Sequence, residues 1–453
     1  MARSWTQAEA STPVLTSSLY LFTSKVLSYG MRLLLPLVLV RLLTVYDFGS
    51  YRQFFLLESY IGALFQIGLN QALFYLVPRD VRNAGSYFIN SIIMNVIAFV
   101  IIFAVVGLGR DQLSGFLRMA VLRDEFWVLA AYVVTLILTI GCDCFLAARQ
   151  SVKAAAAFEV GGQVLVSSLS VVAAYATRDL HTVLVSLVLG RFLQLAGMLV
   201  FIQFRLHGFR SDRYFVGIRE QIRYSVVLGA GGTLITMLAR LHEFMVSRYY
   251  GTEGFAVYSA GCTEIPVVPM FAQSVAVVAL GQFAALEQRG DWAGMRSLWR
   301  RVMASSYAVM LPVTLLFVVF AEPLIVAMCT SAYGDAAPIF RMNALTKIAL
   351  VFNYTLVLRA VNRNDITLWI NVVALAVAPF ALYGGMVIAG MVGIISVQVL
   401  LMIGTRMAGM IVMNRLAPEP MPYFVGFREI WDFYEELWRK AKAFGAKLRA
   451  GNA

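Results

Sequence analysis

The chain alternates between long apolar stretches and short polar connections along most of its length. Twelve stretches are long enough to cross a bilayer as helices, which takes about 20 mostly apolar residues. A lipid-exposed backbone must satisfy its own hydrogen bonds, so we expect each stretch to be a helix. The pattern predicts an all-α polytopic membrane protein with about 12 transmembrane helices. The predicted spans are 15–40, 53–77, 86–108, 126–148, 157–176, 182–204, 224–247, 256–283, 304–328, 342–361, 366–388 and 390–413.

The amino-acid composition narrows the class of protein. Hydrophobic residues make up 60% of the 453 residues, and charged residues only 14%. Soluble domains average about 45–50% apolar and about 25% charged residues. The composition therefore excludes a soluble enzyme, a disulfide scaffold and a disordered chain. Short connections leave little room for a catalytic domain outside the membrane, and the histidines are few, so we expect neither enzyme activity nor a bound metal or cofactor.

The formal net charge of +12 reflects membrane topology rather than nucleic-acid binding. Basic residues are not clustered on a polar domain, as nucleic-acid binding would require. Twelve spans place both termini on the same side of the membrane. The connections on that side, together with Arg359 at the end of the adjoining span, carry 15 Lys and Arg residues, against 8 on the other side. By the positive-inside rule, we expect both termini to be cytoplasmic.

A long basic connection at 207–223 divides the predicted spans into two lobes of six helices. We place the N-terminal lobe at 1–206 and the C-terminal lobe at 207–417. The segments 40–51 and 247–258 share Arg, Phe and Tyr at a constant offset of 207 residues. A match at three positions leaves chance as the alternative to an internal repeat. Two parallel repeats would be related by an axis along the membrane normal, with a substrate site between them near the midplane.

The tail at 418–453 differs from the rest of the chain. It begins with a helix-breaking Pro-Glu-Pro-Met-Pro cluster and continues with the periodicity of an amphipathic helix. We expect this helix to lie on the cytoplasmic lipid surface. Binding of a partner protein is the alternative. The aromatic residues that recur at helical spacing are Phe427, Trp431, Tyr434 and Trp438.

Charged residues inside the predicted spans are the best indication of function, because each costs about 2.5–3.5 kcal/mol at the centre of a membrane helix on insertion scales. Lys25 and Arg32 lie two helical turns apart and share one face. Arg359 and Arg406 lie near span ends and are expected to extend toward the membrane surface. The basic candidates inside spans are Lys25, Arg32, Arg191, Arg240 and Lys347. The acidic residues that accompany them are Glu58, Asp143, Glu243 and Glu264.

The basic set predicts a site for an anion, because guanidinium groups offer paired donors that match phosphate oxygens. The acidic set would balance this charge or bind a coupling proton or cation. The alternative is that these groups serve packing alone. Arg240 and Glu243 would then form a local pair, and Lys25 would extend toward the membrane surface.

Two segments resemble a known transporter family. The stretch 41–80 contains Arg-Leu-Leu, then Asp-Phe-Gly-x-Tyr at 47–51, then Gly68-Leu69. In 310–345 a Pro-bearing apolar helix leads into a Tyr-x-x-Ala segment at 333–336. The chain is similar to Wzx-type lipid-linked oligosaccharide flippases, which are polysaccharide transporters of the multidrug/oligosaccharidyl-lipid/polysaccharide (MOP) superfamily. The resemblance extends over most of 15–413.

This resemblance implies a V-shaped transporter of the bacterial inner membrane with a cationic cavity between two six-helix lobes. Such a protein moves an undecaprenyl-diphosphate-linked oligosaccharide from the cytoplasmic to the periplasmic leaflet by alternating access. The product would serve O-antigen, capsule or exopolysaccharide assembly, beside a polysaccharide polymerase and chain-length machinery. A proton or sodium ion would couple transport. Lys25, Arg32 and Arg240 are the positions that would contact the diphosphate.

Two features depart from this family pattern. The related lipid II flippases have two further helices, so twelve spans argue against that branch. The near balance of acids and bases inside the spans also weakens the prediction of a strongly anion-selective cavity.

Two other functions fit parts of the sequence. A multidrug or cation antiporter of the same superfamily would depend on its membrane acids and tolerate the loss of Arg32. A membrane glycan polymerase would need a sizeable extramembrane segment or an Asp-x-Asp metal motif. No Asp-x-Asp occurs in the chain.

Overall fold

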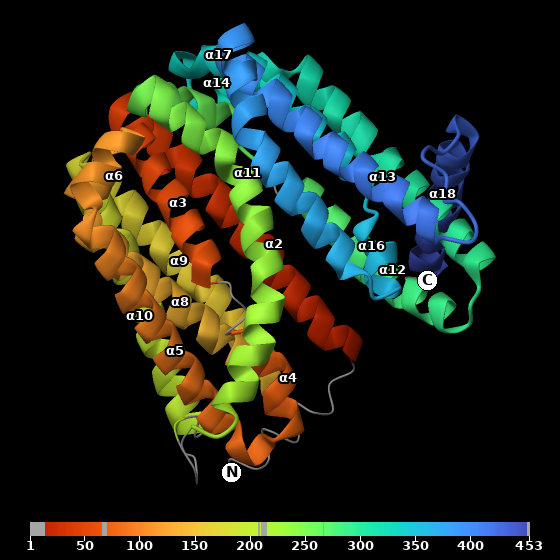
Figure 1. Ribbon diagram of the computed structural model, residues 1–453, viewed down its shortest axis with the longest axis horizontal. Helices are drawn as coiled ribbons and strands as arrows, with labels where there is room; N and C mark the ends of the chain where they lie inside the picture. Colours follow the sequence, from red (N-terminus) through yellow and green to blue (C-terminus); the bar gives the residue numbers. More distant parts are fainter. Residues whose placement is uncertain (1–13, 66–69, 207–208, 210–214, 266, 451–453) are drawn as a thin grey trace. The chain divides into compact units, whose positions relative to one another are not determined.

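The computed structural model describes residues 14–65, 70–206, 209, 215–265 and 267–450. These residues form helices joined by turns and short connections, and no β-strand occurs among them. Contacts divide the chain into two compact units, Met1–Ser259 and Ala260–Ala453. The predicted fold class, an all-α polytopic membrane protein of about 12 transmembrane helices in two lobes, is confirmed (Figure 1).

In the first unit, α8 occupies the centre of a helix bundle. It packs against α3, α4, α5, α9 and α10, and α9 packs in turn against α2 and α10. The rings of Phe88 on α5 and Phe145 on α8 stack with centroids 4.4 Å apart in the buried core. The helices of this unit are α2 (Val14–Leu42), α3 (Val45–Phe65), α4 (Ala72–Arg79), α5 (Ala84–Leu108), α6 (Arg110–Leu117), α7 (Ala120–Asp124), α8 (Phe126–Ala148), α9 (Val152–Thr177), α10 (Leu180–Leu206) and α11 (Ile218–Gly261), whose last two residues belong to the second unit.

The second unit is arranged around α13 and α15. Helix α13 packs against α12, α15 and α18, and α15 packs against α17. The α-helices of this unit are α12 (Val267–Gln288), α13 (Trp292–Val319), α14 (Ala321–Cys329), α15 (Ala337–Ala349), α16 (Thr355–Ala360), α17 (Asn364–Leu416) and α18 (Phe427–Ala450).

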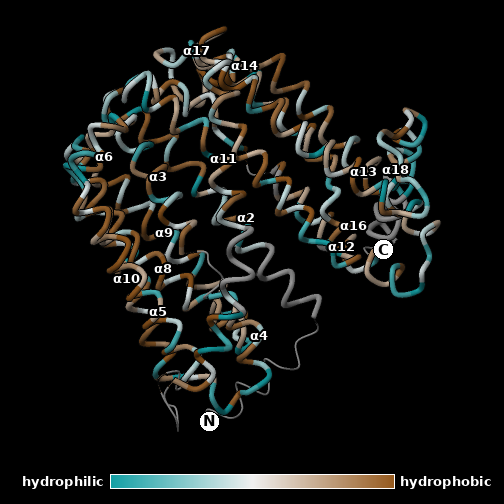
Figure 2. Tube along the Cα trace, in the orientation of Figure 1, coloured by the Kyte–Doolittle hydropathy of each residue, from teal (hydrophilic) through white to brown (hydrophobic). Residues whose placement is uncertain are grey.

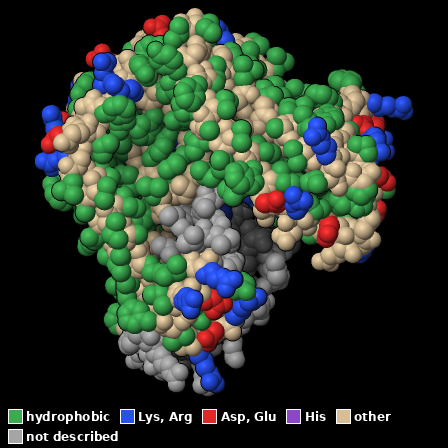
Figure 3. All heavy atoms as spheres, viewed as in Figure 1, with side chains coloured by type: hydrophobic (Ala, Val, Ile, Leu, Met, Phe, Trp, Pro, Cys, Tyr) green, Lys and Arg blue, Asp and Glu red, His purple; other side chains and the backbone are tan. Residues whose placement is uncertain are grey.

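Apolar side chains cover outer faces of the first unit. On α5, Ile97, Val100, Ile101 and Val105 are exposed, and the tube of this helix is largely hydrophobic (Figure 2). Hydrophobic side chains cover much of the face that Figure 3 shows, and charged side chains occur on it in scattered groups. Seven helices in the described part of the chain are long and apolar enough to cross a membrane. Exposed apolar surface of this extent is what contact with lipid requires.

One of these seven helices, α17, contains two predicted spans. Its backbone breaks at Ala389 (φ −142°) and Gly390 (φ 58°), between the predicted spans 366–388 and 390–413. Gly390 occupies the left-handed region that favours glycine. Beyond the break the two arms approach closely, because a Cβ atom on Gly393 would lie 1.9 Å from the carbonyl oxygen of Gly385. The two spans therefore form a tight helical hairpin.

Helix α3 begins at Val45, eight residues before the predicted span at 53–77. The Thr44 hydroxyl accepts a hydrogen bond from the backbone N–H of Asp47 (3.1 Å) and donates one to its carboxylate (2.7 Å). This reciprocal arrangement resembles a capping box, which satisfies N–H groups at a helix start. The span is then divided between α3, which ends at Phe65, and α4, which begins at Ala72. The early start places Arg52 on a helix rather than in a loop.

The boundary between the units falls after α11 has almost ended. Several hydrogen bonds join α11 to α3, among them Gln53 Nε2 to Ser247 Oγ at 2.7 Å and Thr233 Oγ1 to the carbonyl of Ala63 at 2.7 Å. The predicted lobe boundary at 207 adjoins residues 207–208 and 210–214, which lie outside the described residues. That boundary therefore stays a prediction, as do the limits of the predicted tail.

Candidate functional site

A cavity of about 320 Å³ with both apolar and charged side chains in its wall lies inside the first unit, between α2, α3, α8, α9, α10 and α11. Leu35, Leu56 and Val166 contribute apolar wall. Charged side chains from four of these helices reach the cavity. They are Arg32 on α2, Arg52 and Glu58 on α3, Arg191 on α10, and Arg240 and Glu243 on α11.

Five of the nine charged residues proposed from the sequence thus line one cavity: Arg32, Glu58, Arg191, Arg240 and Glu243. The other four do not line it. Lys25 is exposed two turns before Arg32 on α2, and Asp143 is half-buried near the end of α8. Lys347, which is buried on α15, and the exposed Glu264 belong to the second unit.

A single glutamine links two of the arginines. The side-chain oxygen of Gln163 on α9 accepts hydrogen bonds from Arg32 Nε and from Arg191 Nη2, both at 3.3 Å. Its amide nitrogen donates to Ser167 Oγ at 3.2 Å. Gln163 is itself only 2% exposed. A buried, neutral acceptor therefore holds two guanidinium groups from different helices at one point without cancelling their charge.

A second glutamine fixes Arg191 from the other side. Arg191 Nη1 donates to Gln194 Oε1 at 2.9 Å, and Gln194 Nε2 donates to the carbonyl oxygen of Phe158 at 3.1 Å. Gly162 leaves room for this contact, because a Cβ atom there would lie 2.1 Å from Gln194 Cδ. Arg191 Nε is buried without a hydrogen-bond partner among the described residues. Arg191 is thus held in place and keeps an unused donor.

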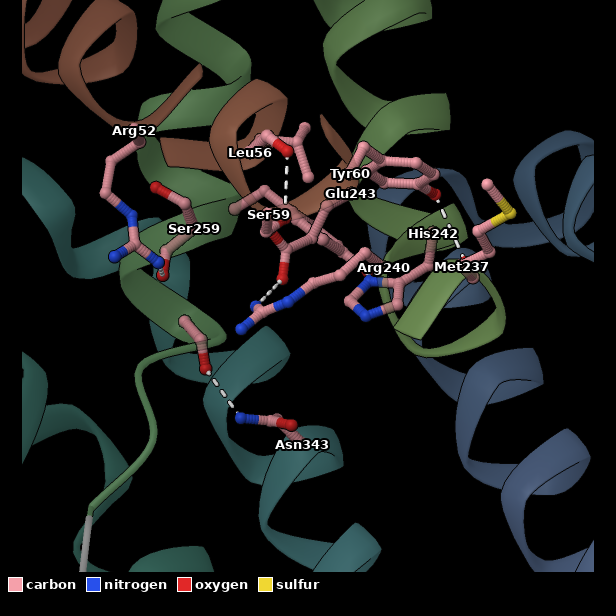
Figure 4. Close-up of polar contacts among 12 residues, drawn as sticks. Arg52, Leu56, Ser59, Tyr60, Met237, Arg240, His242, Glu243, Ser259 and Asn343 are labelled. Atoms are coloured by element: carbon pink, nitrogen blue, oxygen red, sulfur yellow. Dashed lines mark hydrogen bonds and ion pairs between the residues drawn. The ribbon is translucent and has the colours of Figure 1, made fainter. Parts of the chain in front are cut away.

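The α3–α11 side of the cavity is organised differently (Figure 4). Arg240 Nη1 contacts Glu243 Oε1 at 2.6 Å, one turn along the same helix. Arg52 Nη2 donates to the carbonyl oxygen of Ser259 at 3.3 Å. The hydroxyl of Tyr60 donates to the carbonyl oxygen of Met237 at 3.2 Å, which ties α3 to α11 about one turn before Arg240. Arg240 therefore already has a carboxylate partner.

The cavity carries an excess of positive charge. Four arginines and two glutamates contribute to its wall. The ion pair between Arg240 and Glu243 lies in this cavity. Charges act over longer distances in such a partly enclosed, low-dielectric space than in water. The balance of acids and bases over all spans thus does not hold locally, and the arrangement suits an anion.

A smaller cavity of about 250 Å³ adjoins the first and shares Glu58 and Leu136 with it. Asn70 lies in its wall. The Asn70 side-chain oxygen accepts hydrogen bonds from Ser91 Oγ (3.0 Å) and Asn95 Nδ2 (2.8 Å). The wall of this smaller cavity is uncharged apart from Glu58. Glu58 therefore borders both the arginine-lined cavity and a largely neutral one.

Two residues of the cavity were missed from the sequence. The predicted span 53–77 leaves Arg52 outside a helix because the apolar pattern starts only after it, although the Thr44-x-x-Asp47 spacing marks the earlier helix start. Gln163 lies in an apolar run and carries no charge, so hydropathy and charge patterns both overlook it. Its position among small residues is the one signal that the sequence offers.

Comparison with known proteins gives a matching family and similar solved structures. A family model described as polysaccharide biosynthesis protein matches residues 38–338. No curated protein matches the chain. The inward-facing conformation of a multidrug resistance MATE family transporter of the MOP superfamily is similar with a TM-score of 0.71 and 13% identity, covering 86% of this chain and 94% of that one.

Two further transporters share the fold. A mutant of a MATE transporter from Vibrio cholerae has a TM-score of 0.62 and 14% identity, covering 92% of this chain and 97% of its own. A MOP superfamily transporter from Pyrococcus furiosus has a TM-score of 0.64 and 13% identity, covering 88% and 95%. At these identities the likeness establishes the fold. Since the family model spans well over half of the sequence, the chain belongs to the polysaccharide biosynthesis protein family, and its fold is that of MOP superfamily transporters.

Proposed function

We propose that the protein is a flippase that moves an undecaprenyl-diphosphate-linked oligosaccharide from the cytoplasmic to the periplasmic leaflet by alternating access. The observation that carries this proposal is the arginine-lined cavity, in which Gln163 holds Arg32 and Arg191 together. Membership of the polysaccharide biosynthesis protein family supports it. The glycan would be a precursor of O-antigen, capsule or exopolysaccharide.

The cavity matches the chemistry of a diphosphate. Its wall carries two more arginines than glutamates, and a diphosphate ester carries one negative charge on each phosphate. Guanidinium groups bind phosphate oxygens with paired, parallel hydrogen bonds. A volume of about 320 Å³ corresponds to roughly ten water molecules at about 30 Å³ each. That space holds the diphosphate and the start of the glycan, so the remaining sugars and the lipid tail would extend beyond it.

The second candidate is a multidrug or cation antiporter, and the MATE transporters of the same fold favour it. The charge of the cavity wall distinguishes the flippase from the antiporter. A cavity wall in which arginines outnumber acids repels a cationic drug, unless the acids are released from their arginine partners. For the Pyrococcus furiosus transporter, the reversed polarity of its binding pocket suggests a different function. By the same reasoning, the basic lining here favours an anionic substrate.

The proposal includes several elements beyond the diphosphate. Glu58 and Glu243 are the acids in the cavity and would bind the coupling proton or sodium ion. The protein would reside in the bacterial inner membrane with both termini in the cytoplasm. A polysaccharide polymerase and chain-length machinery would take the flipped product.

The test in cells uses a deletion strain complemented with variants. Arg32→Gln combined with Arg191→Gln removes both guanidinium groups that Gln163 links, and should cause lipid-linked glycan to accumulate on the inner leaflet. Arg123→Gln is the matched control, because Arg123 is 59% exposed on α7 and does not line the cavity. Full glycan export by the double variant at wild-type protein level would overturn the proposal.

A binding measurement then separates the two candidates. The purified protein in nanodiscs should bind undecaprenyl diphosphate more tightly than undecaprenyl monophosphate, and should not bind tetraphenylphosphonium. The double variant should lose the preference for diphosphate. Binding of the lipophilic cation without binding of the diphosphate would establish the antiporter instead.

A further inference from the structure

The C-terminal helix α18 is held against α13 by specific contacts. Trp299 Nε1 on α13 donates a hydrogen bond to the carbonyl oxygen of Pro422 at 3.0 Å. Arg300 Nη1 lies 3.5 Å from Glu429 Oε1, and the Tyr434 hydroxyl donates to the carbonyl oxygen of Ala308. Figure 1 shows α18 beside α13. The helix is therefore docked on the second unit.

The connection to α17 is also fixed. Asn414 Nδ2, two residues before the end of α17, donates to the carbonyl oxygen of Met421 at 2.9 Å, and its Oδ1 accepts from the backbone N–H of Met421 at 2.8 Å. The helix α18 starts soon afterwards, at Phe427. Ala308, which Tyr434 contacts, lies in the apolar part of α13. Trp299 and Arg300 lie in the first third of α13 and Asn414 lies near the end of α17, so the start of α18 is beside these helix ends, whereas Tyr434 reaches the middle of α13.

One face of α18 presents four large aromatic side chains: the Tyr434 hydroxyl on this face contacts α13, and the other three side chains remain largely exposed. Phe427 is 78% exposed, Trp431 55% and Trp438 65%. Spacings of four and seven residues place all three on the same helix face. The rings of Phe427 and Trp431 stack with centroids 6.4 Å apart. A contiguous exposed apolar surface of this kind marks an interaction site, and tryptophan is enriched where membranes meet water.

Charge along α18 identifies the partner. The first half, 427–437, has one basic and four acidic residues, whereas the second half, 438–450, has five basic residues and no acid. Two of the acids are engaged: Glu429 pairs with Arg300, and Glu435 accepts hydrogen bonds from Trp431 and Arg439. A basic segment next to an aromatic stripe complements a surface of anionic lipids.

We propose that α18 lies in the interfacial region of the leaflet at the adjoining ends of α13 and α17. Phe427, Trp431 and Trp438 insert among the lipid headgroups, and the basic second half binds anionic lipid. This surface is separate from the arginine-lined cavity and does not depend on the transported substrate. Anionic lipid, rather than a protein, is the partner that fits exposed tryptophans followed by a basic segment on a helix packed against the membrane-spanning α13.

The test uses the full chain, with its four cysteines replaced by alanine, in vesicles of phosphatidylglycerol and phosphatidylcholine. A spin label at Trp431→Cys reports on the aromatic face, and Asp432→Cys, an exposed neighbour, is the matched control. We expect the label at 431 to be more accessible to dissolved oxygen than to a water-soluble nickel chelate. The control should show the reverse.

Two changes should remove this protection. Pure phosphatidylcholine vesicles should increase nickel access to the label at 431, and glutamine at all five basic positions of 438–450 should do the same in phosphatidylglycerol. A circular dichroism spectrum establishes that the glutamine variant is folded. Equal nickel access at 431 and 432 in every vesicle would overturn the proposal. Protection that appears only after cell extract is added would also overturn it, and would indicate a protein partner.

Discussion

Replacing Gln163 with glutamate changes the charge of the proposed diphosphate site with little change in shape. The new carboxylate would occupy the position of the amide oxygen, 3.3 Å from Arg32 Nε and 3.3 Å from Arg191 Nη2. A phosphate bound by the same two guanidinium groups would lie about 6 Å from it. At an effective dielectric constant of about 20, the repulsion is about 2–3 kcal/mol. The dissociation constant of undecaprenyl diphosphate should therefore rise roughly 30- to 150-fold.

Gln163→Leu is the matched control, because it removes the acceptor without adding charge. It leaves Nη2 of the buried Arg191 without its acceptor, whereas the exposed Arg32 can bind water. Gln163→Leu should therefore lower stability by about 1.5–3 kcal/mol, with a smaller effect on affinity than glutamate. The assay combines diphosphate binding in nanodiscs with the thermal unfolding midpoint of each variant. We expect leucine to have the larger effect on stability and glutamate the larger effect on affinity. Diphosphate binding by the glutamate variant at the wild-type level would refute the electrostatic argument.

Two further predictions concern the scaffold. Gly393→Ala should destabilise the α17 hairpin by more than about 1–3 kcal/mol, because its Cβ atom would lie 1.9 Å from a carbonyl oxygen of the opposite arm. Unfolding in detergent measures this loss. Gly404→Ala is the control, because a Cβ atom at that position would enter open space. Asp179 accepts the backbone N–H of Thr182 at the start of α10 (2.9 Å), and these hydrogen bonds lower the pKa of its carboxyl group. At pH values above the unfolded pKa of about 3.9, Asp179→Ala should thus lower the free energy of unfolding by about 1 kcal/mol. The difference from wild type should vanish as the pH falls through the lower pKa of the folded state. An equal loss at all pH values would contradict this reasoning.

The helical architecture was predictable because hydropathy determines where a chain can cross a bilayer. The predicted span 126–148 coincides with α8, which has charged residues just beyond both ends. Bends inside apolar segments were not predictable, because averaged hydropathy does not register them. The span 304–328 is divided into α13 and α14, and 342–361 into α15 and α16. Apolar residues adjoin each break on both sides.

The candidate site was predictable only as far as charge indicates it. Arg32, Arg191 and Arg240 were identified because a charge in an apolar helix is costly, and costly groups are retained for function. Their common location depends on how α2, α10 and α11 pack, which no single-helix pattern contains. Gln163 shows the same limit, because its importance comes from two arginines 131 and 28 residues away in sequence.

The arginines of the cavity should differ in how much they contribute to binding, because their partners differ. Arg191 is held by two neutral glutamines and keeps its full charge for a phosphate. Arg240 lies 2.6 Å from a Glu243 oxygen, so a phosphate that approaches it competes with a carboxylate. Arg191→Gln should lose a charged hydrogen bond worth about 1.5–3 kcal/mol. This loss corresponds to a dissociation constant roughly 10- to 150-fold higher.

The charge-conserving double variant Arg240→Gln with Glu243→Gln isolates this difference. It removes one positive and one negative charge together, so the diphosphate affinity should stay within about threefold of wild type, which is about 0.7 kcal/mol. Arg240→Gln alone should weaken binding, because it leaves Glu243 without its partner in the cavity wall. If the double variant loses as much affinity as Arg191→Gln, Arg240 contacts the phosphate directly. The distinction between Arg191, which neutral glutamines hold, and Arg240, which pairs with an acid, would then be wrong.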